Sequence, residues 1–590
     1  MKVSDTKQKS SSQSFLKGAL VLTISMIAVK LCGLAQKVLL TNLYGTLGGN
    51  YAEFGTALFS NAYELYVPLF TLATVGFPIA VSRLISESYA KERYNDIKQI
   101  YKVAKPFFMV MGVICFLLMT VGSFFYVNNV IKSPYSLPAL LVLAPTIFFG
   151  CLVSVYRGYY EGLRNMTPTA ISEVLEAFSK IAIGVVMSYV VVNIGVKQYA
   201  ASGTIFGMAF NNIDDAYRTL VSISVATSIF GITMGSVIAF LFLRIRFAVR
   251  KGEIPESYYV NSPEALAKRE TFRRMCVTAL PIGIGALVMS FSSSIDAIVI
   301  QNLIYRMAEV SPEALKAEFN HILDSEIPAN GKITIHTCIW GYYSASLTLT
   351  SLVIAVTQVF GTSAMPNVTA AYTKGNKEDL KESINTVLRL TTIVTFPCAI
   401  GLSVLASPIL SLVYSGNANI AMFGGEVLQV LGVSVIFMGT ITPICSMLQG
   451  IGKVKSSMGI YIFGTISKIL VSYLFARNIS INIVGSAIGS LVSNFLMCTI
   501  ALFLLVKSTK IMPDFLSAAV KPMLSAVVCG VSAYVSFYLL NINLLFTIVI
   551  SAIFYLLVLL VLHTFSKNDV LMLPKGKKIV IILEKLHLIR

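Results

Sequence analysis

The sequence predicts an all-α integral membrane protein with fourteen transmembrane helices, arranged as two parallel six-helix repeats followed by two C-terminal helices. Its 590 residues are 56% hydrophobic and 13% charged, whereas soluble proteins carry about 45–50% apolar and about 25% charged residues. Long apolar runs recur along the chain, and short sequences recur between its halves. So few charges cannot cover a water-facing surface, which excludes soluble enzymes and nucleic-acid-binding proteins.

The N-terminal segment predicts a cytoplasmic tail and a first span, not a cleaved signal. Residues 1–14 are polar, and an apolar run follows over 15–43. That run is much longer than the apolar core of a signal peptide, which has about 7–15 residues, and no small-residue cleavage motif follows it.

The remaining spans are predicted by length, because a membrane-crossing helix needs about 20 mostly apolar residues. Hydrocarbon offers backbone groups no water partner, so continuous runs of this kind span as helices. The fourteen predicted spans are 15–43, 57–82, 106–127, 137–156, 169–193, 219–243, 276–304, 338–371, 385–414, 426–449, 457–476, 482–506, 518–540 and 543–565.

The distribution of positive charge supports this count. With the N-terminus inside, 35 of the 46 Lys and Arg residues fall in predicted cytoplasmic segments or at the cytoplasmic edges of spans (Lys17, Arg389 and Lys521), and only seven fall in outside loops. An excess of Lys and Arg in cytoplasmic loops is what orients membrane proteins. One missed helix would invert every later loop, so we expect a multi-pass protein of the cell membrane with both termini in the cytoplasm.

An internal repeat organises the predicted helices. Glu161-Gly162-Leu163 matches Gln449-Gly450-Ile451, and Ser179-Lys180-Ile181 matches Ser467-Lys468-Ile469, both at an offset of 288 residues. Six helices are an even number, so the two copies have the same orientation, as in transporters with parallel repeats. The predicted parts are an N-tail (1–14), an N-lobe (15–250), a cytoplasmic linker (251–275), a C-lobe (276–506), two further helices (507–566) and a basic cytoplasmic C-tail (567–590).

Ionisable residues near the middle of spans are the candidate functional residues. Lys30, Lys180 and Lys468 lie near the centres of the first, fifth and eleventh predicted spans. A Lys there costs about 2.5–3.5 kcal/mol on insertion scales and normally faces a cavity or the bundle interior. We expect a basic central cavity that binds an anionic substrate, with Glu176 as an alternative ion-pair partner of Lys180 four residues later.

A second set of charges is expected nearer the outside. Lys37 follows Lys30 by seven residues on the same helix face, and Glu64 and Asp296 lie at a comparable depth. The two acids pair with Lys37, line an outer vestibule or bind a coupling cation; the sequence leaves these alternatives open. Arg83, at the cytoplasmic end of the second span, is either an interface anchor or a substrate contact.

Motifs for other chemistries are absent from the sequence. No GxxxxGK[ST] phosphate loop and no CxxC pair occurs, and the nine Cys residues are scattered through apolar stretches. His321 and His336 lie in the acidic outer loop 305–337 without the spacing of metal ligands, and we expect that loop to be solvated. We expect a protein without cofactors that is not an enzyme, and whose transport is coupled to the membrane potential, Na⁺ or H⁺.

Three segments resemble the MOP exporter superfamily, in particular its polysaccharide and lipid-linked oligosaccharide flippase branch of stage V sporulation protein B-like and MurJ-like proteins. They are AVKLCGLAQKVLLTNLYG in the first span, PLFTLATVGFPIAVSRLISE at the end of the second, and YRGYYEGLRNMTPTAISEVLEAFSK at the junction of the fourth and fifth. The resemblance implies two lobes around a cavity that opens alternately to the two sides, with Lys30 where such flippases place a basic residue.

The resemblance also implies a substrate. It is an undecaprenyl-pyrophosphate-linked sugar intermediate, either a lipid II-like peptidoglycan precursor or another polysaccharide precursor, exported by a protein that works as a monomer among membrane lipids and binds no nucleic acid. One alternative is a MATE-type drug/cation antiporter, whose cavity would be acidic. Another, of a different class, is a membrane-embedded transferase or a non-transporting scaffold.

Overall fold

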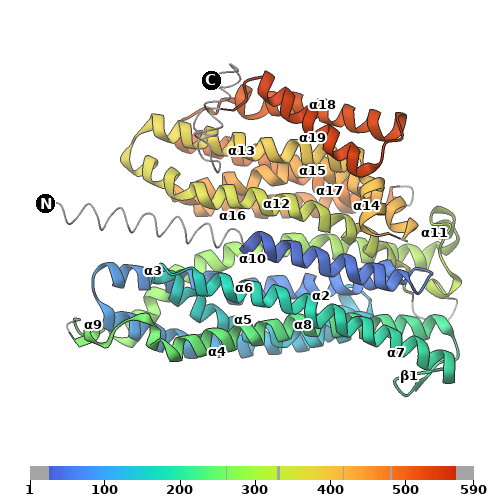
Figure 1. The fold of residues 1–590 in the computed structure, drawn as a ribbon, viewed down its shortest axis with the longest axis horizontal. Helices are drawn as coiled ribbons and strands as arrows, with labels where there is room; N and C mark the ends of the chain where they lie inside the picture. Colours follow the sequence, from blue (N-terminus) through green and yellow to red (C-terminus); the bar gives the residue numbers. More distant parts are fainter. Residues whose placement is uncertain (1–24, 261, 329–332, 416, 479–480, 566–590) are drawn as a thin grey trace. The chain divides into compact units, whose positions relative to one another are not determined.

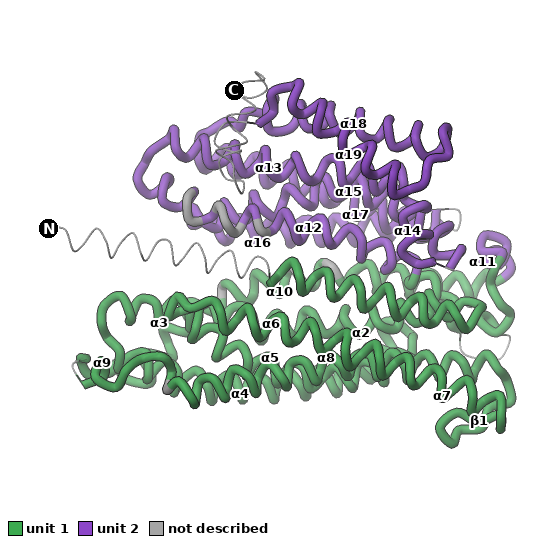
Figure 2. Tube along the Cα trace, viewed as in Figure 1, with its two compact units in different colours: residues 1–312, 321–341 green, residues 313–320, 342–590 purple. Residues whose placement is uncertain are grey.

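The computed structural model describes residues 25–260, 262–328, 333–415, 417–478 and 481–565. Fourteen helices in these ranges are long and apolar enough to cross a membrane, which confirms the predicted count. The chain divides into two compact units, residues 1–312 with 321–341 and residues 313–320 with 342–590 (Figure 2). Each unit is described separately below.

The first unit contains ten helices among its described residues, nine of them labelled in Figure 1. They are the first span (Ser25–Gly45), α2 (Tyr51–Thr74), α3 (Gly76–Ala90), α4 (Tyr94–Phe125), α5 (Leu137–Gly162), α6 (Thr167–Ser179), α7 (Val186–Ser202), α8 (Ile213–Val249), α9 (Glu256–Val260) and α10 (Lys268–Val310). A two-residue hairpin of β1 (Thr204–Ile205) and β2 (Met208–Ala209) joins α7 to α8.

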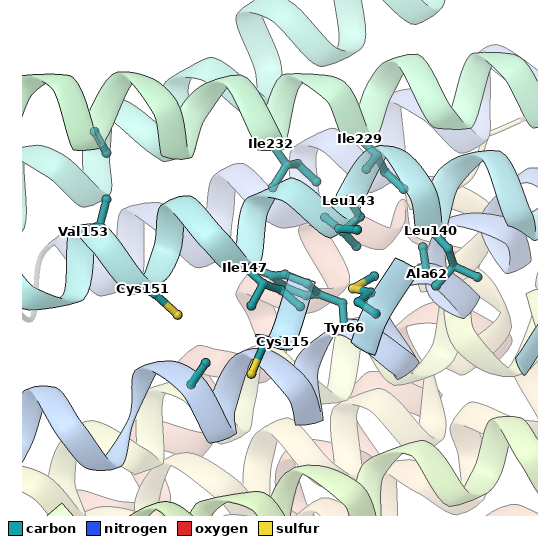
Figure 3. Close-up of a cluster of buried hydrophobic side chains, with 14 of the residues drawn as sticks. Ala62, Tyr66, Cys115, Leu140, Leu143, Ile147, Cys151, Val153, Ile229 and Ile232 are labelled. Atoms are coloured by element: carbon teal, nitrogen blue, oxygen red, sulfur yellow. The ribbon is translucent and has the colours of Figure 1, made fainter. Parts of the chain in front are cut away.

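Helix α5 is the central element of this unit, because α2, α3, α4 and α8 all pack against it. Figure 3 shows the apolar side chains that fill its surroundings, among them Tyr66 of α2, Cys115 of α4 and Ile229 of α8. Small residues allow the closest approaches, as is usual where lipid removes the hydrophobic drive between helices. A Cβ on Gly76 of α3, for example, would collide with the backbone of α10 at Ala279.

The second unit contains the remaining long helices. They are α12 (Ile335–Lys374, whose first residues belong to the first unit), α13 (Lys377–Val404), α14 (Ala406–Val413), α15 (Ala418–Gly450), α16 (Val454–Ala476), α17 (Asn482–Thr509), α18 (Lys521–Tyr534) and α19 (Leu544–Val561), with the short α11 (Pro312–Glu318). Helix α15 packs against α13 and α17, and α18 with α19 covers α13. The hydroxyl of Tyr555 on α19 donates a hydrogen bond to the Ile393 carbonyl, 2.7 Å away.

Several elements differ from the predicted boundaries. The second predicted span is broken at Val75 into α2 and α3, and the ninth is broken into α13 and α14. The fifth contains a π-helical turn, η3 (Lys180–Val185), between α6 and α7. Most helices extend past the apolar runs, because helical hydrogen bonding continues beyond the hydrocarbon whereas hydropathy reports only the part inside it.

The two units contain similar helix contacts. Gly184 of η3 packs against Gly231 of α8, and Ser472 of α16 packs against Gly489 of α17. Gly184 and Ser472, the first residues of the two pairs, are separated by the predicted offset of 288 residues. The contacts agree with the repeat, which stays a prediction, as do the lobe boundaries. The first compact unit also includes α10, which the repeat interpretation assigns to the second copy.

Candidate functional site

A cluster of charged side chains lies where α5 and α6 meet, at the end of these helices that the charge pattern predicts to be cytoplasmic. Arg157 and Glu161 come from α5, and Glu173 and Glu176 come from α6. Lys180 follows as the first residue of η3. Positions 173, 176 and 180 are spaced by three and four residues, which places them on one helix face. Wide π turns of this kind occur frequently at functional sites.

Arg157 is the residue of this cluster that the sequence analysis missed. One of its terminal nitrogens, Nη2, lies 3.2 Å from Glu176 Oε2, and its Nε donates a hydrogen bond to Ser172 Oγ at 2.9 Å. The side chains of Arg157 and Glu176 are 20% and 23% exposed. In this structure the ion-pair contact of Glu176 is with Arg157, and Lys180 interacts with Glu176 only electrostatically, so a direct pair between Glu176 and Lys180 stays a prediction.

The first span joins the cluster through a second acid. Ser25 Oγ donates a hydrogen bond to Glu173 Oε2 at 2.7 Å. Glu161 interacts electrostatically with Arg157 and Glu173. Together with Lys30 and Lys180, the cluster contains three basic and three acidic side chains. The cluster therefore contains acids as well as cations, and the basic central cavity predicted from the lysines stays a prediction.

The three predicted substrate-binding lysines have different surroundings. Lys30 is exposed on the first span, and Lys180 is half-buried and interacts electrostatically with both Glu176 and Lys30. Lys468 is half-buried on α16 of the second unit. The structure brings Lys30 and Lys180 together in one cluster, whereas the sharing of one cavity by all three lysines stays a prediction. Arg83 is exposed on α3.

The outer set of charges is more deeply buried. Lys37 is 9% exposed, its Nζ donates a hydrogen bond to Ser60 Oγ at 3.0 Å, and it interacts electrostatically with Glu64. Asp296 is buried on α10. Of the alternatives for these residues, attraction between Lys37 and Glu64 is present in the structure. An outer vestibule and a coupling-cation site at Glu64 and Asp296 stay predictions.

The positions in the second unit that match the cluster at the predicted offset are uncharged apart from the lysine. Arg157 corresponds to Cys445, Glu173 to Tyr461 and Glu161 to Gln449. The side chain of Tyr461 lies beside Cys445, and Gln449 Nε2 donates a hydrogen bond to Ser457 Oγ at 3.2 Å. On the repeat interpretation, Arg157 and the acids of the cluster therefore have no charged counterpart in the second copy.

Family models match both parts of the chain. The model described as polysaccharide biosynthesis protein matches residues 15–366, more than half of the chain. The chain belongs to this family. The model described as MatE matches residues 341–474, and both families are members of the MOP superfamily. Membership in the superfamily agrees with the resemblance seen in the sequence.

Relatives and a solved structure match most of the length of this chain. Stage V sporulation protein B of Bacillus subtilis is 23% identical over 570 residues, covering 95% of this chain and 98% of that protein. Lipid II flippase MurJ of Bacillus subtilis is 21% identical over 500 residues, covering 82% of each. A structure of lipid II flippase MurJ in an inward closed conformation matches with a TM-score of 0.59 and 14% identity over 92% of this chain and 99% of that one.

A transporter of the MATE family has the same fold. Its inward-facing structure matches with a TM-score of 0.57 and 14% identity, covering 83% of this chain and 98% of that chain. This chain, with fourteen membrane-length helices in its described ranges, is thus a multi-pass membrane protein, and its relatives are transporters and flippases.

Proposed function

We propose that this protein is an alternating-access flippase that moves an undecaprenyl-pyrophosphate-linked sugar intermediate across the cell membrane. The observation that carries the proposal is the group of Lys30, Arg157 and Lys180 on membrane-spanning helices of a chain related to a lipid II flippase. These cations would bind the pyrophosphate, while the lipid tail stays in the bilayer. Lys468 would contribute from the second lobe.

The membrane potential supports movement in the proposed direction. With a negative cell interior, outward transfer of each negative charge gains about 2.3 kcal/mol per 100 mV. The substrate must also be released, and Lys30 and Lys180 would hold it as point charges, so that Arg157 is the one cation of the three that can form two parallel hydrogen bonds with it. We also propose that the protein acts as a monomer with both termini in the cytoplasm. Glu64 and Asp296 are the candidate sites for coupling to Na⁺ or H⁺.

Flipping of purified lipid-linked precursors in proteoliposomes, with and without an imposed potential, tests the proposal. We expect the double variant Lys30→Ala, Lys468→Ala to lose flipping, Lys30→Arg to keep it and Lys30→Gln to lose it, because the positive charge binds the substrate. Lys91→Ala is the matched control, since Lys91 is an exposed lysine paired with Glu87 outside the cluster. Full flipping by the double variant would contradict the proposal.

A MATE-type cation antiporter is the second candidate, and one specific observation favours it. Glu161, Glu173 and Glu176 bring three carboxylates into the cluster, and residues 341–474 match the MatE family model. Such a protein would bind an organic cation in exchange for Na⁺ or H⁺. Uptake of a fluorescent organic cation by inside-out vesicles, lost in Glu173→Gln and unaffected by lipid-linked precursors, would favour this function over the flippase.

A further inference from the structure

The ion pair between Arg157 and Glu176 is incomplete on the arginine side. A guanidinium has five N–H donors and usually grips a carboxylate or phosphate with two parallel hydrogen bonds. Here the contact joins one nitrogen to one oxygen at 3.2 Å, and Nη2 makes no hydrogen bond within the described ranges. The remaining anchor is Ser172, which fixes Nε and so orients the guanidinium. Arg157 is therefore held in place with donor capacity unused.

Glu176 has a second cation within reach. Lys180 lies four residues later on the same face and interacts electrostatically with Glu176, but within the described part of the chain no carboxylate lies within 4.0 Å of its ammonium. Pairs at this spacing form on a helix surface without backbone movement. A rotation of the Glu176 side chain can thus transfer the acid from Arg157 to Lys180.

Glu173, the other acid of α6, is held differently. It accepts the hydrogen bond from Ser25 Oγ on the first span at 2.7 Å. It carries the same charge as Glu176, lies one turn away on the same helix, and is not the ion-pair partner of Arg157. The cluster therefore contains one acid placed to exchange partners and a neighbouring acid that acts on Arg157 only through its electrostatic field.

We propose that Arg157 binds the phosphate of the substrate and that Glu176 is its internal substitute, occupying the guanidinium while the site is empty. This inference rests on the proposed function. When the anionic head group arrives, Arg157 exchanges the Glu176 carboxylate for phosphate oxygens, and Glu176 turns to Lys180. Arg157 has an anionic partner and Glu176 a cationic one in both states, which matters because breaking an ion pair in a partly buried site is strongly destabilising.

The exchange accounts for both steps that a carrier must complete. The substrate has to compete with Glu176, so its affinity stays moderate and release on the far side remains possible. After release, Glu176 returns to Arg157. The guanidinium therefore keeps an anionic partner while the empty protein returns to its starting conformation.

Binding of farnesyl pyrophosphate, a short polyprenyl pyrophosphate, to the purified full-length chain tests this proposal by titration calorimetry. We expect Glu176→Gln to bind about tenfold more tightly, equivalent to about 1.4 kcal/mol, because the competitor is removed. Arg157→Ala should bind at least tenfold more weakly than the wild type, Arg157→Lys should lie between them, and Arg157→Ala, Glu176→Gln should match Arg157→Ala. Glu87→Gln, which changes an acid paired with Lys91 and Arg274 outside the cluster, is the control and should change affinity little, and Glu173→Gln should tighten binding less than Glu176→Gln.

The alternatives give opposite results. A purely structural ion pair predicts that Glu176→Gln lowers the melting temperature and leaves affinity unchanged or weaker, which would overturn the inference. Equal tightening by Glu173→Gln would also overturn it, because the effect would then be the general field of the acids. If Glu176→Gln fails to fold, Glu176→Asp, which withdraws the carboxylate by one methylene, should still tighten binding, and unchanged affinity would overturn the exchange.

The proposed function can fail separately. No binding of farnesyl pyrophosphate by the wild-type chain, together with no binding of undecaprenyl pyrophosphate in nanodiscs, would count against the flippase and remove this inference with it. Binding by the wild type with no response to Glu176→Gln would overturn only the exchange at Arg157.

Discussion

Two arginines of the first unit meet acids in contrasting ways. Arg218 on α8 is 2% exposed, its Nε donates to Asp214 at 2.8 Å, and its Nη2 lies 3.4 Å from Glu326, which is completely buried. Its guanidinium also lies 5.0 Å from the ring centroid of Phe54. Arg157 has a single ion-pair contact and is ten times more exposed than Arg218. Residue type is the same, so burial and the number of partners separate a structural arginine from an exchangeable one.

We call the group of Arg218 with Asp214, Glu326, Asn50 and Tyr51 the outer cluster, and the group of charges around Arg157 the inner cluster. The outer cluster also fixes a loop. Glu326 lies between α11 and α12, and it accepts a hydrogen bond from Asn50 Nδ2 at 2.8 Å. Tyr51 donates its hydroxyl hydrogen bond to Asp214 at 2.8 Å. Burial raises the pKa of the Glu326 carboxyl, and the nearby Arg218 opposes the shift. Three chain segments are thus fixed to one guanidinium, an arrangement that leaves no acid free to exchange.

The largest effect is expected for Arg218→Ala. Removing one partner of a buried ion pair costs about 3–5 kcal/mol, because Asp214 and Glu326 would stay buried without their cation. The melting temperature of the purified protein should fall much further than in Arg157→Ala, whose acid can turn to Lys180. Equal losses of stability in the two variants would erase the distinction between the clusters.

A pH effect is expected from His321, whose backbone carbonyl accepts a hydrogen bond from Asn50 in the outer cluster. Burial lowers the pKa of His321 to about 4, compared with about 6.5 in an unfolded chain. The neutral imidazole favours the folded state above pH 6.5, and this contribution is lost as the pH falls from about 6.5 to 4. His321→Asn should flatten the acid side of a plot of melting temperature against pH. An unchanged profile would show that His321 is charged in the folded protein.

The smallest effect is expected for Ser172→Ala in the inner cluster. The variant removes the hydrogen bond from Arg157 Nε to Ser172 Oγ and leaves the contact with Glu176. A hydrogen bond of this kind contributes about 1 kcal/mol to stability, so the melting temperature should fall slightly. A loss comparable with that of Arg218→Ala would place Arg157 among the structural arginines.

The fold was predictable because hydrocarbon thickness dictates helix length, and fourteen membrane-length helices in the described ranges match the fourteen apolar runs. Breaks inside those runs were not predictable from hydropathy. The break at Val75 adjoins the place where Gly76 packs against α10, and the π turn that begins at Lys180 packs against α8, contacts that hydropathy does not report. The seventh span was predicted to begin at 276, but α10 begins at Lys268 and continues into the span.

The site was less predictable, because charges were judged by their distance from the apolar runs. Arg157 directly follows the predicted fourth span and Arg218 directly precedes the sixth, so both look like ordinary interface residues. In the structure both lie on helices and pair with acids that are distant in sequence. His336 was expected in a solvated loop, but it is completely buried at the start of α12. Pairing between helices carries no signal in the local sequence.

The π turn of η3 has a consequence for comparing relatives of this protein. A π turn accommodates one residue more than the same length of α-helix, so it behaves as a single-residue insertion directly after Lys180. Helix α16 passes through the corresponding Lys468 as uninterrupted α-helix. On the repeat interpretation, the offset between the copies should therefore fall by one residue beyond Val185. Deleting one residue within 181–185 would rotate α7 by about 100° relative to α6, and Ser188 would lose its hydrogen bond to the Ser224 carbonyl on α8. Homologues that lack the turn should therefore show a one-residue gap here and a different α7 surface facing α8.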